Sequence, residues 1–246
     1  MAKASARSKS ATPRRLPRGR HALAPEDVVR DQRERLLAAV PGVVMERGYE
    51  ATSVADIVKA AAVSRNAFYK NFSDKQDCFS TAHEAGHQRL LEILTSPCEE
   101  GATVEERVQR SLAAVLDALA SEPGLARLLF VEAPSAGEEI ALRYHQWLQR
   151  YGTLLRVAAP DASPQSSPAP EVEGVIVGGL ASRVASEVLQ GGGAQLRDLT
   201  EPFVEYVLAF YRPSEPGPKE GKVLAFEPEP VQTSELPDTQ RKQAGA

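Results

Sequence analysis

The sequence contains no long hydrophobic run. Its longest apolar stretch is VIVGGLA at residues 175–181, far shorter than the roughly 20 residues that a membrane-spanning helix needs. The first 20 residues are basic and include no apolar segment after their charges, so they lack the pattern of a secretory signal. We therefore expect a cytoplasmic protein with no membrane partner.

Cysteine is scarce as well, with only Cys78 and Cys98 in 246 residues. Two cysteines are too few for the disulfide framework of a small secreted domain. If both lie on one helix, the residues between them correspond to about 30 Å at 1.5 Å per residue, a gap that no disulfide spans. We expect two reduced thiols, as is usual in cytosolic proteins.

Alternation of period two, the mark of a half-buried strand, is missing too. Apolar residues instead recur at helical spacing from Pro25 onward, which indicates an all-α fold of about nine helices. We expect a first helix that ends at Gly48, two short helices within 52–72, and longer ones over about 74–96, 103–121, 124–132, 138–158, 171–190 and 195–211. Pro41 stands inside the first helix, where a missing N–H costs about 3 kcal/mol, so we expect a bend over Ala38–Pro41.

Composition and charge divide the chain into four parts. We interpret residues 1–29 as a basic flexible arm with the start of the first helix, and residues 30–90 as a helix-turn-helix domain. We expect residues 91–212 to be helical, and the resemblance given below implies that they form a regulatory and dimerisation domain. We expect residues 213–246, rich in Pro, Glu and Gly, to be a disordered tail. Residues 1–75 hold 15 Lys+Arg against 8 Asp+Glu, whereas the remainder holds 14 against 25. This asymmetry favours a nucleic-acid partner for the first third alone.

Residues 52–75 show the pattern of two short helices around a tight turn. Ser53 or Thr52 can cap the first helix and Ser64 the second, while Phe68 and Phe72, four residues apart, are expected to pack inward. In a helix-turn-helix, arginine suits guanine edges, asparagine suits adenine edges, and hydroxyls, lysine and tyrosine suit phosphates. We predict DNA contacts from Thr52, Ser53, Ser64, Arg65, Asn66, Tyr69, Lys70, Asn71 and Lys75. The alternative is a short amphipathic surface helix without a DNA role.

A competing motif, HEAGH, lies at residues 83–87. His83 and His87 are one helical turn apart and can hold zinc while Glu84 activates a water, as in a zinc-dependent hydrolase; Glu105 or Glu106 would be the third ligand. A regulatory metal on the two histidines alone is a further alternative. Nothing marks either downstream glutamate as a ligand, and zinc needs more ligands than two. We expect no metal, no cofactor and no catalysis.

Residues 33–79 resemble the DNA-binding domain of the TetR family of transcriptional regulators. The likeness rests on RERLLAA and ERGY in the first helix, T-S-V-x-D-I-V in the second, A-x-V-S-R at the turn, F-Y-x-x-F in the recognition helix and D-K at the start of the fourth. Beyond residue 90 the resemblance is architectural, with a local likeness in GLARLLFVEA. Pro41-Gly42 departs from the family pattern, in which the first helix continues with helix-forming residues.

The resemblance implies a homodimeric, ligand-responsive regulator, usually a repressor, that binds a palindromic DNA operator and is released by a small-molecule effector. It places Tyr69 and Lys75 at phosphate-contacting positions. It places base-reading or groove-facing positions at Arg65, Asn66, Lys70 and Asn71. We expect the helix that starts at Asp74 to change its angle when the effector binds, because it joins the DNA-binding and regulatory parts.

The same resemblance implies two further sites. The last two long helices of each subunit are expected to form the dimer interface through Val175, Ile176, Gly179, Leu180, Phe203, Val207 and Phe210. A ligand cavity is expected next to it, with apolar walls from Leu128, Phe130, Tyr144, Trp147, Tyr151 and Leu154. Polar groups would come from His87, Arg143 or His145. For each pocket residue a plain packing role is the alternative.

The basic arm is an addition that many TetR-family members lack. We predict that it enters a minor groove or lies along phosphates through Arg14, Arg15, Arg18 and Arg20. The alternative is a solvated tail that only aids solubility.

Overall fold

The structure, a computed structural model, describes residues 24–96, 103–158 and 170–211, all of which belong to one compact unit. Its α-helices are α1 Pro25–Ala51, α2 Val54–Ala61, α3 Arg65–Asn71, α4 Lys75–Thr95, α5 Val104–Ser121, α6 Pro123–Ala126, α7 Glu138–Ala158, α8 Pro170–Leu189 and α9 Thr200–Ala209. A π-helical segment, Arg127–Glu132, and a 3₁₀ turn, Ala133–Ser135, join α6 to α7, and a 3₁₀ segment, Gly193–Leu199, precedes α9. These ranges contain no strand, so the predicted all-α fold is confirmed.

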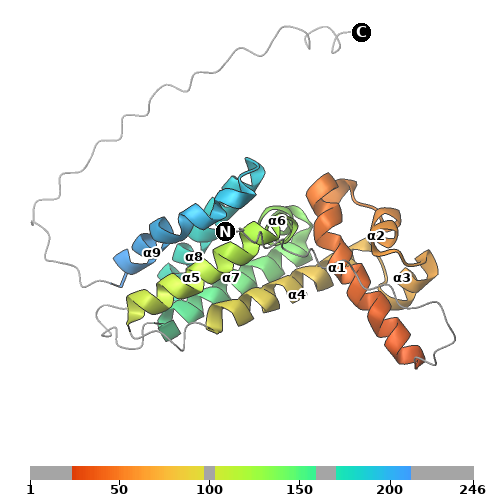
Figure 1. The fold of residues 1–246 in the computed structure, drawn as a ribbon, viewed down its shortest axis with the longest axis horizontal. Coiled ribbons are helices and arrows are strands. Elements are labelled where there is room, and N and C mark those ends of the chain that lie inside the picture. Colours follow the sequence, from red (N-terminus) through yellow and green to blue (C-terminus); the bar gives the residue numbers. More distant parts are fainter. Residues whose placement is uncertain (1–23, 97–102, 159–169, 212–246) are drawn as a thin grey trace, which may run out of the picture. The chain divides into compact units, whose positions relative to one another are not determined.

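The helices fall into two groups that share α1 and α4 (Figure 1). α1 packs against α2 and α3 and also against α6 and the π-helical segment, while α4 contacts α1, α5 and α7. α7 packs against α8, and α5 packs against α9. One core runs through both groups, from Phe68 and Phe79 to Leu90, Leu116 and Leu128. α1 and α4 therefore both link the short helices to the bundle.

α1 does not depart from helical geometry at its proline. Helical conformation continues through Pro41, and the non-helical residue inside α1 is Gly48, with φ 75° and ψ 167°. The predicted stop at Gly48 is confirmed. No residue over Ala38–Pro41 leaves helical φ/ψ, and the bend expected there stays a prediction. Packing holds this turn, because α6 crosses α1 so closely that a Cβ on Gly124 would stand 2.6 Å from the Pro41 carbonyl oxygen. Tertiary contacts here override the local preference.

The described helices also bear on the membrane and thiol predictions. None of them is both long and apolar enough to cross a membrane. Cys78 is a buried free thiol, and burial raises its pKa to about 12, which keeps it protonated and unreactive at neutral pH. Cys98 lies outside the described residues.

Candidate nucleic-acid interface and ligand cavity

The helix-turn-helix is built from caps that the sequence supplies locally. The Asp56 carboxylate accepts the Ser53 backbone N–H at 3.0 Å and the Ser53 hydroxyl accepts the Asp56 N–H, which closes a capping box at the start of α2. Hydrogen bonds from Ser53 hold the pKa of Asp56 below its ordinary value. α2 ends at Ala62 in a left-handed conformation, φ 52°, and Ser64 Oγ accepts the Ala67 N–H at 3.0 Å to begin α3. This tight turn sets the crossing of α2 and α3.

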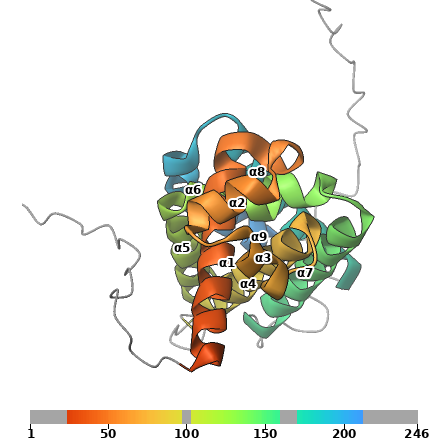
Figure 2. The same cartoon turned by 90° about the vertical axis from the view of Figure 1, so that its right-hand side faces the viewer.

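α3 lies with α1 and α2 at the end of the molecule that faces the viewer in Figure 2. Its inner face is aromatic and its outer face is polar. Phe68 and Phe72 are buried, at 0% and 2% exposure, so their predicted inward packing is confirmed. The Arg65 guanidinium lies 5.7 Å from the centre of the Tyr69 ring, which is half exposed. The exposed side chains of α3 are Arg65, Asn66, Tyr69 and Lys70. The structure thus groups four of the predicted DNA contacts on one solvent-facing surface.

Two predicted phosphate contacts are directed inward instead. Thr52 is 4% exposed, and its hydroxyl donates to the Gly48 carbonyl at 2.6 Å; the structure therefore corrects this prediction. The Lys75 ammonium donates to the Tyr49 carbonyl at 3.0 Å and to the Glu50 carbonyl at 3.4 Å. It also lies 4.2 Å from the Tyr49 ring centre. Lys75 thus ties α4 to the end of α1, a role that residue type and spacing do not reveal.

The remaining predicted DNA contacts differ in availability. Ser53 and Ser64 are exposed, although each hydroxyl accepts a capping hydrogen bond. Asn71 is half-buried, and its side-chain amide donates to the Ala67 carbonyl at 2.8 Å. The predicted arm contacts lie outside the described residues: Arg14, Arg15, Arg18 and Arg20.

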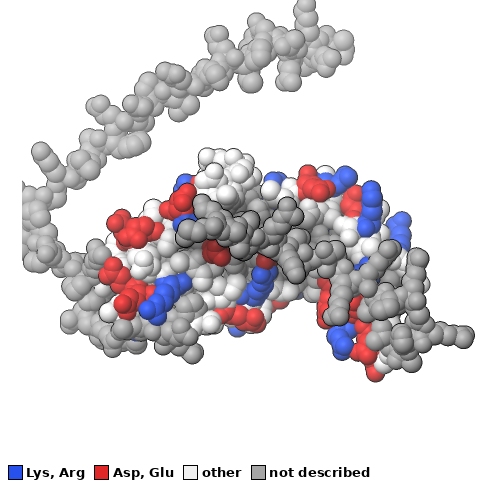
Figure 3. Space-filling view, in the orientation of Figure 1, with Lys and Arg blue, Asp and Glu red and all other residues white. Residues whose placement is uncertain are grey.

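Surface charge is mixed around the helix-turn-helix. On the face shown in Figure 3, lysine and arginine side chains lie among acidic ones along the part formed by α1 and α2, and acidic side chains gather toward the opposite end of the bundle. The exposed basic residues of α3 itself, Arg65 and Lys70, stand without an acidic residue in the helix. The exposed face of α3 thus carries two basic side chains and no acidic one.

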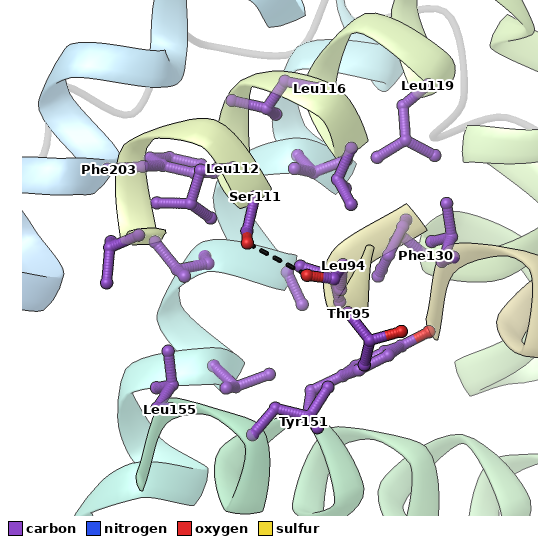
Figure 4. A pocket seen from close by; sticks show the side chains of 18 of the residues that line it. Leu94, Thr95, Ser111, Leu112, Leu116, Leu119, Phe130, Tyr151, Leu155 and Phe203 are labelled. Atoms are coloured by element: carbon purple, nitrogen blue, oxygen red, sulfur yellow. Dashed lines mark hydrogen bonds between the residues drawn. The ribbon is translucent and has the colours of Figure 1, made fainter. Parts of the chain in front are cut away.

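An apolar cavity of about 410 Å³ lies among α4, α5, α7, α8 and α9 (Figure 4). Its walls are mainly leucine and valine side chains, closed on one side by Phe130. The polar groups along the lining belong to Thr95, Arg107 and Ser111, and the Ser111 hydroxyl donates to the Leu94 carbonyl at 2.9 Å. The volume and apolar lining are those of a small-molecule site.

The predicted pocket residues divide into three groups. Those that line the cavity are Phe130, Tyr151 and Leu154. Those buried in the core without lining it are His87, Leu128, Tyr144 and Trp147. Arg143 and His145 are exposed on α7. The correction has a simple cause: helical period shows which side chains point inward, but not which of them leave space between helices.

The sequence reading missed the wall contributed by α5. Seven of its residues line the cavity at helical spacing, namely Arg107, Val108, Ser111, Leu112, Val115, Leu116 and Leu119. The signal that marks them is an amphipathic stripe with one small polar residue, Ser111, in its middle. α4 adds Leu90, Leu94 and Thr95 to the same cavity.

The two histidines of HEAGH form a buried pair behind this wall. Their Nε2 atoms lie 3.0 Å apart, and His87 Nδ1 lies 2.8 Å from the Tyr151 hydroxyl. The Trp147 ring stacks on His87 with centres 5.1 Å apart, and its Nε1 donates to Glu84 at 2.9 Å. Burial lowers the pKa of His83 to about 4 and that of His87 well below its ordinary value, the second aided by the His83 charge. Both rings are therefore neutral at pH 7.

Comparison with known proteins places this geometry in a family. The family model described as "Bacterial regulatory proteins, tetR family" matches residues 36–82, which run from α1 through the helix-turn-helix into α4. The structure resembles that of the transcriptional regulator FadR from Bacillus subtilis in complex with stearoyl-CoA, with a TM-score of 0.63, 18% identity, and coverage of 73% of this chain and 99% of that one. Residues 36–82 thus form a TetR-type DNA-binding domain, and the described chain has the fold of TetR-family regulators.

Two relatives in sequence are regulators as well. The HTH-type transcriptional repressor DhaR of Mycobacterium sp. (strain GP1) is 26% identical over 144 residues, which are 52% of this chain and 73% of DhaR. The fatty acid metabolism regulator protein of Bacillus subtilis (strain 168) is 23% identical over 120 residues, 49% of this chain and 62% of that protein. The chain thus spans less than two thirds of the second relative.

The predicted dimer residues split between surface and interior. Val175, Gly179 and Phe210 are exposed. Ile176, Phe203 and Val207 are buried within the protomer, while Leu180 is half-buried and, with Phe203, lines the cavity. The structure therefore corrects part of the prediction, because α8 and α9 have two apolar faces and one of them closes the bundle.

The zinc-hydrolase alternative finds no support in the TetR-family fold. The described residues include no group of three or more potential metal ligands. Glu84, the supposed base, is bonded to Trp147, and Glu105 and Glu106 lie in the first turn of α5. The Thr103 backbone N–H donates to Glu106 as part of a cap. Glu84 thus accepts a hydrogen bond from a neighbouring helix, and Glu106 caps the start of α5.

Proposed function

We propose that the protein is a cytoplasmic, dimeric repressor that leaves its DNA operator when a small molecule fills the cavity. One observation carries this proposal: α4 serves both sites. Its first residue, Lys75, is bonded to the end of α1 beside the helix-turn-helix, and its last turns supply Leu90 and Leu94 to the cavity. A ligand between α4 and α5 acts directly on the helix that positions the recognition helix.

We assign DNA contacts to the four exposed side chains of α3. Arg65, Asn66 and Lys70 suit base edges in the major groove, because guanidinium and amide groups form paired hydrogen bonds with guanine and adenine. Tyr69, which stacks beside Arg65, suits a phosphate. Ser53 and Ser64, exposed at the two helix starts, suit phosphates on either side. Lys75 is a phosphate contact only if it leaves the α1 carbonyls.

The outer face of α8 and α9 supports the proposed dimer. Val175 and Leu189 are 67% and 63% exposed, and Tyr206 and Phe210 are each 37% exposed. Gly179 lets Tyr206 approach, since a Cβ there would stand 2.9 Å from the tyrosine hydroxyl. Contiguous exposed apolar side chains of this kind mark an interaction surface. Two copies joined here would present two recognition helices to a palindromic operator.

The cavity favours an effector with a long aliphatic part. Its lining is almost entirely leucine, valine and phenylalanine, which no polar metabolite would fill without leaving its own groups unpaired. Arg107 adds one cationic side chain for an anionic group. The structurally similar FadR of Bacillus subtilis is in complex with stearoyl-CoA. We therefore propose a fatty acyl compound as the effector class.

The experiment is a selection of genomic DNA fragments by the purified full-length protein, followed by affinity measurements with and without stearoyl-CoA. We expect a palindromic fragment, whose affinity falls at least 5-fold when the acyl compound binds, in the usual range of allosteric coupling. Arg65→Ala should lower affinity by about 1–3 kcal/mol, whereas Arg143→Ala, an exposed arginine on α7, should not. Absence of any selected fragment would overturn the proposal.

A further inference from the structure

The π-helical segment Arg127–Glu132 lies between the cavity and the end of α1. It packs against α1, α4 and α8, and its residues Leu128 and Leu129 are fully buried. Phe130 faces the cavity, while Glu132, two residues later, reaches α1. π-Helical turns are rare and are found mostly at functional sites, where one extra residue per turn can be taken up or released. One short segment therefore touches both the ligand site and the DNA-binding part.

Glu132 is a nearly buried carboxylate, 9% exposed, with a hydrogen bond on each side. Its Oε2 accepts the backbone N–H of Tyr49 at 2.7 Å, and its Oε1 accepts Nε–H of Arg127 at 2.8 Å. Gly48 lies beside this carboxylate, since a Cβ there would stand in van der Waals contact with Oε2 at 3.4 Å. Gly48 also takes the positive φ that turns the chain out of α1. The carboxylate thus holds the turn where α1 ends.

Tyr49 passes this contact on to α2 and α4. Its carbonyl accepts both the Thr52 backbone N–H at 3.1 Å and the Lys75 ammonium at 3.0 Å. Its ring meets Phe79 of α4 edge-on, with centres 4.5 Å apart. Thr52 directly precedes the capping box of α2, and Lys75 is the first residue of α4. A shift of Tyr49 therefore moves the starts of the two helices that place α3.

We propose that Glu132 is a positioning residue that transmits the state of the cavity to the helix-turn-helix. A ligand that displaces Phe130 changes the register of the π-helical segment, and Glu132 moves with it and pulls on the Tyr49 backbone. The inference rests on the proposed ligand-responsive function and adds to it a route other than the tilt of α4. Coupling of this kind requires that the ligand bind the two arrangements with different affinity.

The test is the ratio of operator affinities with and without stearoyl-CoA, using the selected DNA fragment and full-length protein. Glu132→Gln should bind stearoyl-CoA within about 3-fold of the wild type by calorimetry, while the ratio falls from at least 5 to below 2. Arg127→Gln removes the ion pair that holds the Glu132 carboxylate to the π-helical segment, and it should reduce the ratio less than Glu132→Gln does. This variant replaces Glu132→Gln as the test if Glu132→Gln does not fold. The matched control is Glu122→Gln, which removes an exposed ion pair with Arg89 between α4 and the start of α6 and should keep the wild-type ratio. A purely structural role for Glu132 would lower affinity in both states and leave the ratio unchanged, which overturns the proposal.

A second measurement needs no ligand. Phe130→Leu and Glu132→Gln are combined in a double-mutant cycle read by operator affinity of the ligand-free protein. Transmission through the segment predicts that the double variant deviates at least 3-fold from the product of the two single effects. Independent effects would overturn the relay. If stearoyl-CoA leaves wild-type affinity unchanged while the cycle is non-additive, the proposed effector class fails and the relay stands.

Discussion

The crossing of α1 and α6 gives a sharp test of the fold, because it depends on one absent side chain. Gly124 sits where α6 meets the Pro41 turn, and a Cβ on it would stand 2.6 Å from the Pro41 carbonyl oxygen and 2.9 Å from its carbonyl carbon. Both atoms belong to backbone, which cannot rotate away as a side-chain end can. Gly124→Ala must therefore push α6 away from α1.

The destabilisation by Gly124→Ala can be compared with the effect of the same substitution at Gly42, a neighbouring glycine with space for a methyl group. Overpacking typically costs about 1–3 kcal/mol, which outweighs the gain of up to about 1 kcal/mol that alanine brings to a helix. We expect Gly124→Ala to destabilise the protein by about 1–2 kcal/mol. A Cβ added to Gly42, in α1 beside Pro41, would have no atom within 4 Å, so Gly42→Ala should stabilise by about 0.5–1 kcal/mol.

The assay is urea unfolding followed by helical circular dichroism, at fixed protein concentration because a dimer's stability depends on it. The midpoint should fall for Gly124→Ala and rise for Gly42→Ala, with unchanged slopes. If Gly124→Ala equals or exceeds the wild type, the close crossing of α6 on the proline turn is wrong, and with it the reason that α1 tolerates Pro41.

Three further outcomes follow from the same contacts. Because burial lowers the pKa of His83 from 6.5 to about 4, the unfolded chain binds a proton that the native one does not between those values, so stability should fall by about 2 kcal/mol from pH 7 to pH 5. In His83→Gln the urea midpoint should depend less on pH over this range. If the midpoint of this variant changed with pH as much as that of the wild type, the lowered pKa of His83 would be refuted. Ser53→Ala should cost about 0.5–2 kcal/mol through the lost capping box, and a midpoint equal to the wild type's would count against that cap. Phe210→Glu should yield monomers in analytical ultracentrifugation, whereas Leu142→Glu, at an exposed position on α7, should not; a dimeric Phe210→Glu protein would place the interface elsewhere.

The helix-turn-helix was within reach of the sequence because its determinants are local. Ser53 and Ser64 cap helices within three residues of themselves, and Phe68 and Phe72 share a face by helical spacing alone. The contacts of Thr52 and Lys75 could not be predicted in this way. The Thr52 hydroxyl and the Lys75 ammonium both donate to carbonyl groups at the end of α1. For Lys75 that partner lies 26 residues away in the chain, and residue type does not encode it.

The sequence predicts an apolar cavity but not which residues line it. Helical period identifies inward residues such as Trp147 and Tyr151, yet only the second lines the space. Whether inward side chains meet or leave a gap depends on helix crossings, which are set by contacts such as Gly86 against Leu125 and Leu129. The same limit applies to Phe203. The apolar pattern of its helix fits a dimer interface as well as a protomer core, and the structure buries Phe203 within the protomer.

HEAGH shows why a local motif is a weak guide to chemistry. Zinc would need the Nε2 lone pairs of both histidines, but these atoms face each other at 3.0 Å, so a proton already occupies the line between them and one ring donates to the other. His87 then uses its second nitrogen on Tyr151, and Trp147 stacks on its ring. The contacts of His87 with Tyr151 and Trp147 join α4 to α7, and Tyr151 also lines the cavity. The spacing that suits a metal on an exposed helix therefore serves, on a buried one, to fasten the connecting helix to the ligand-binding bundle.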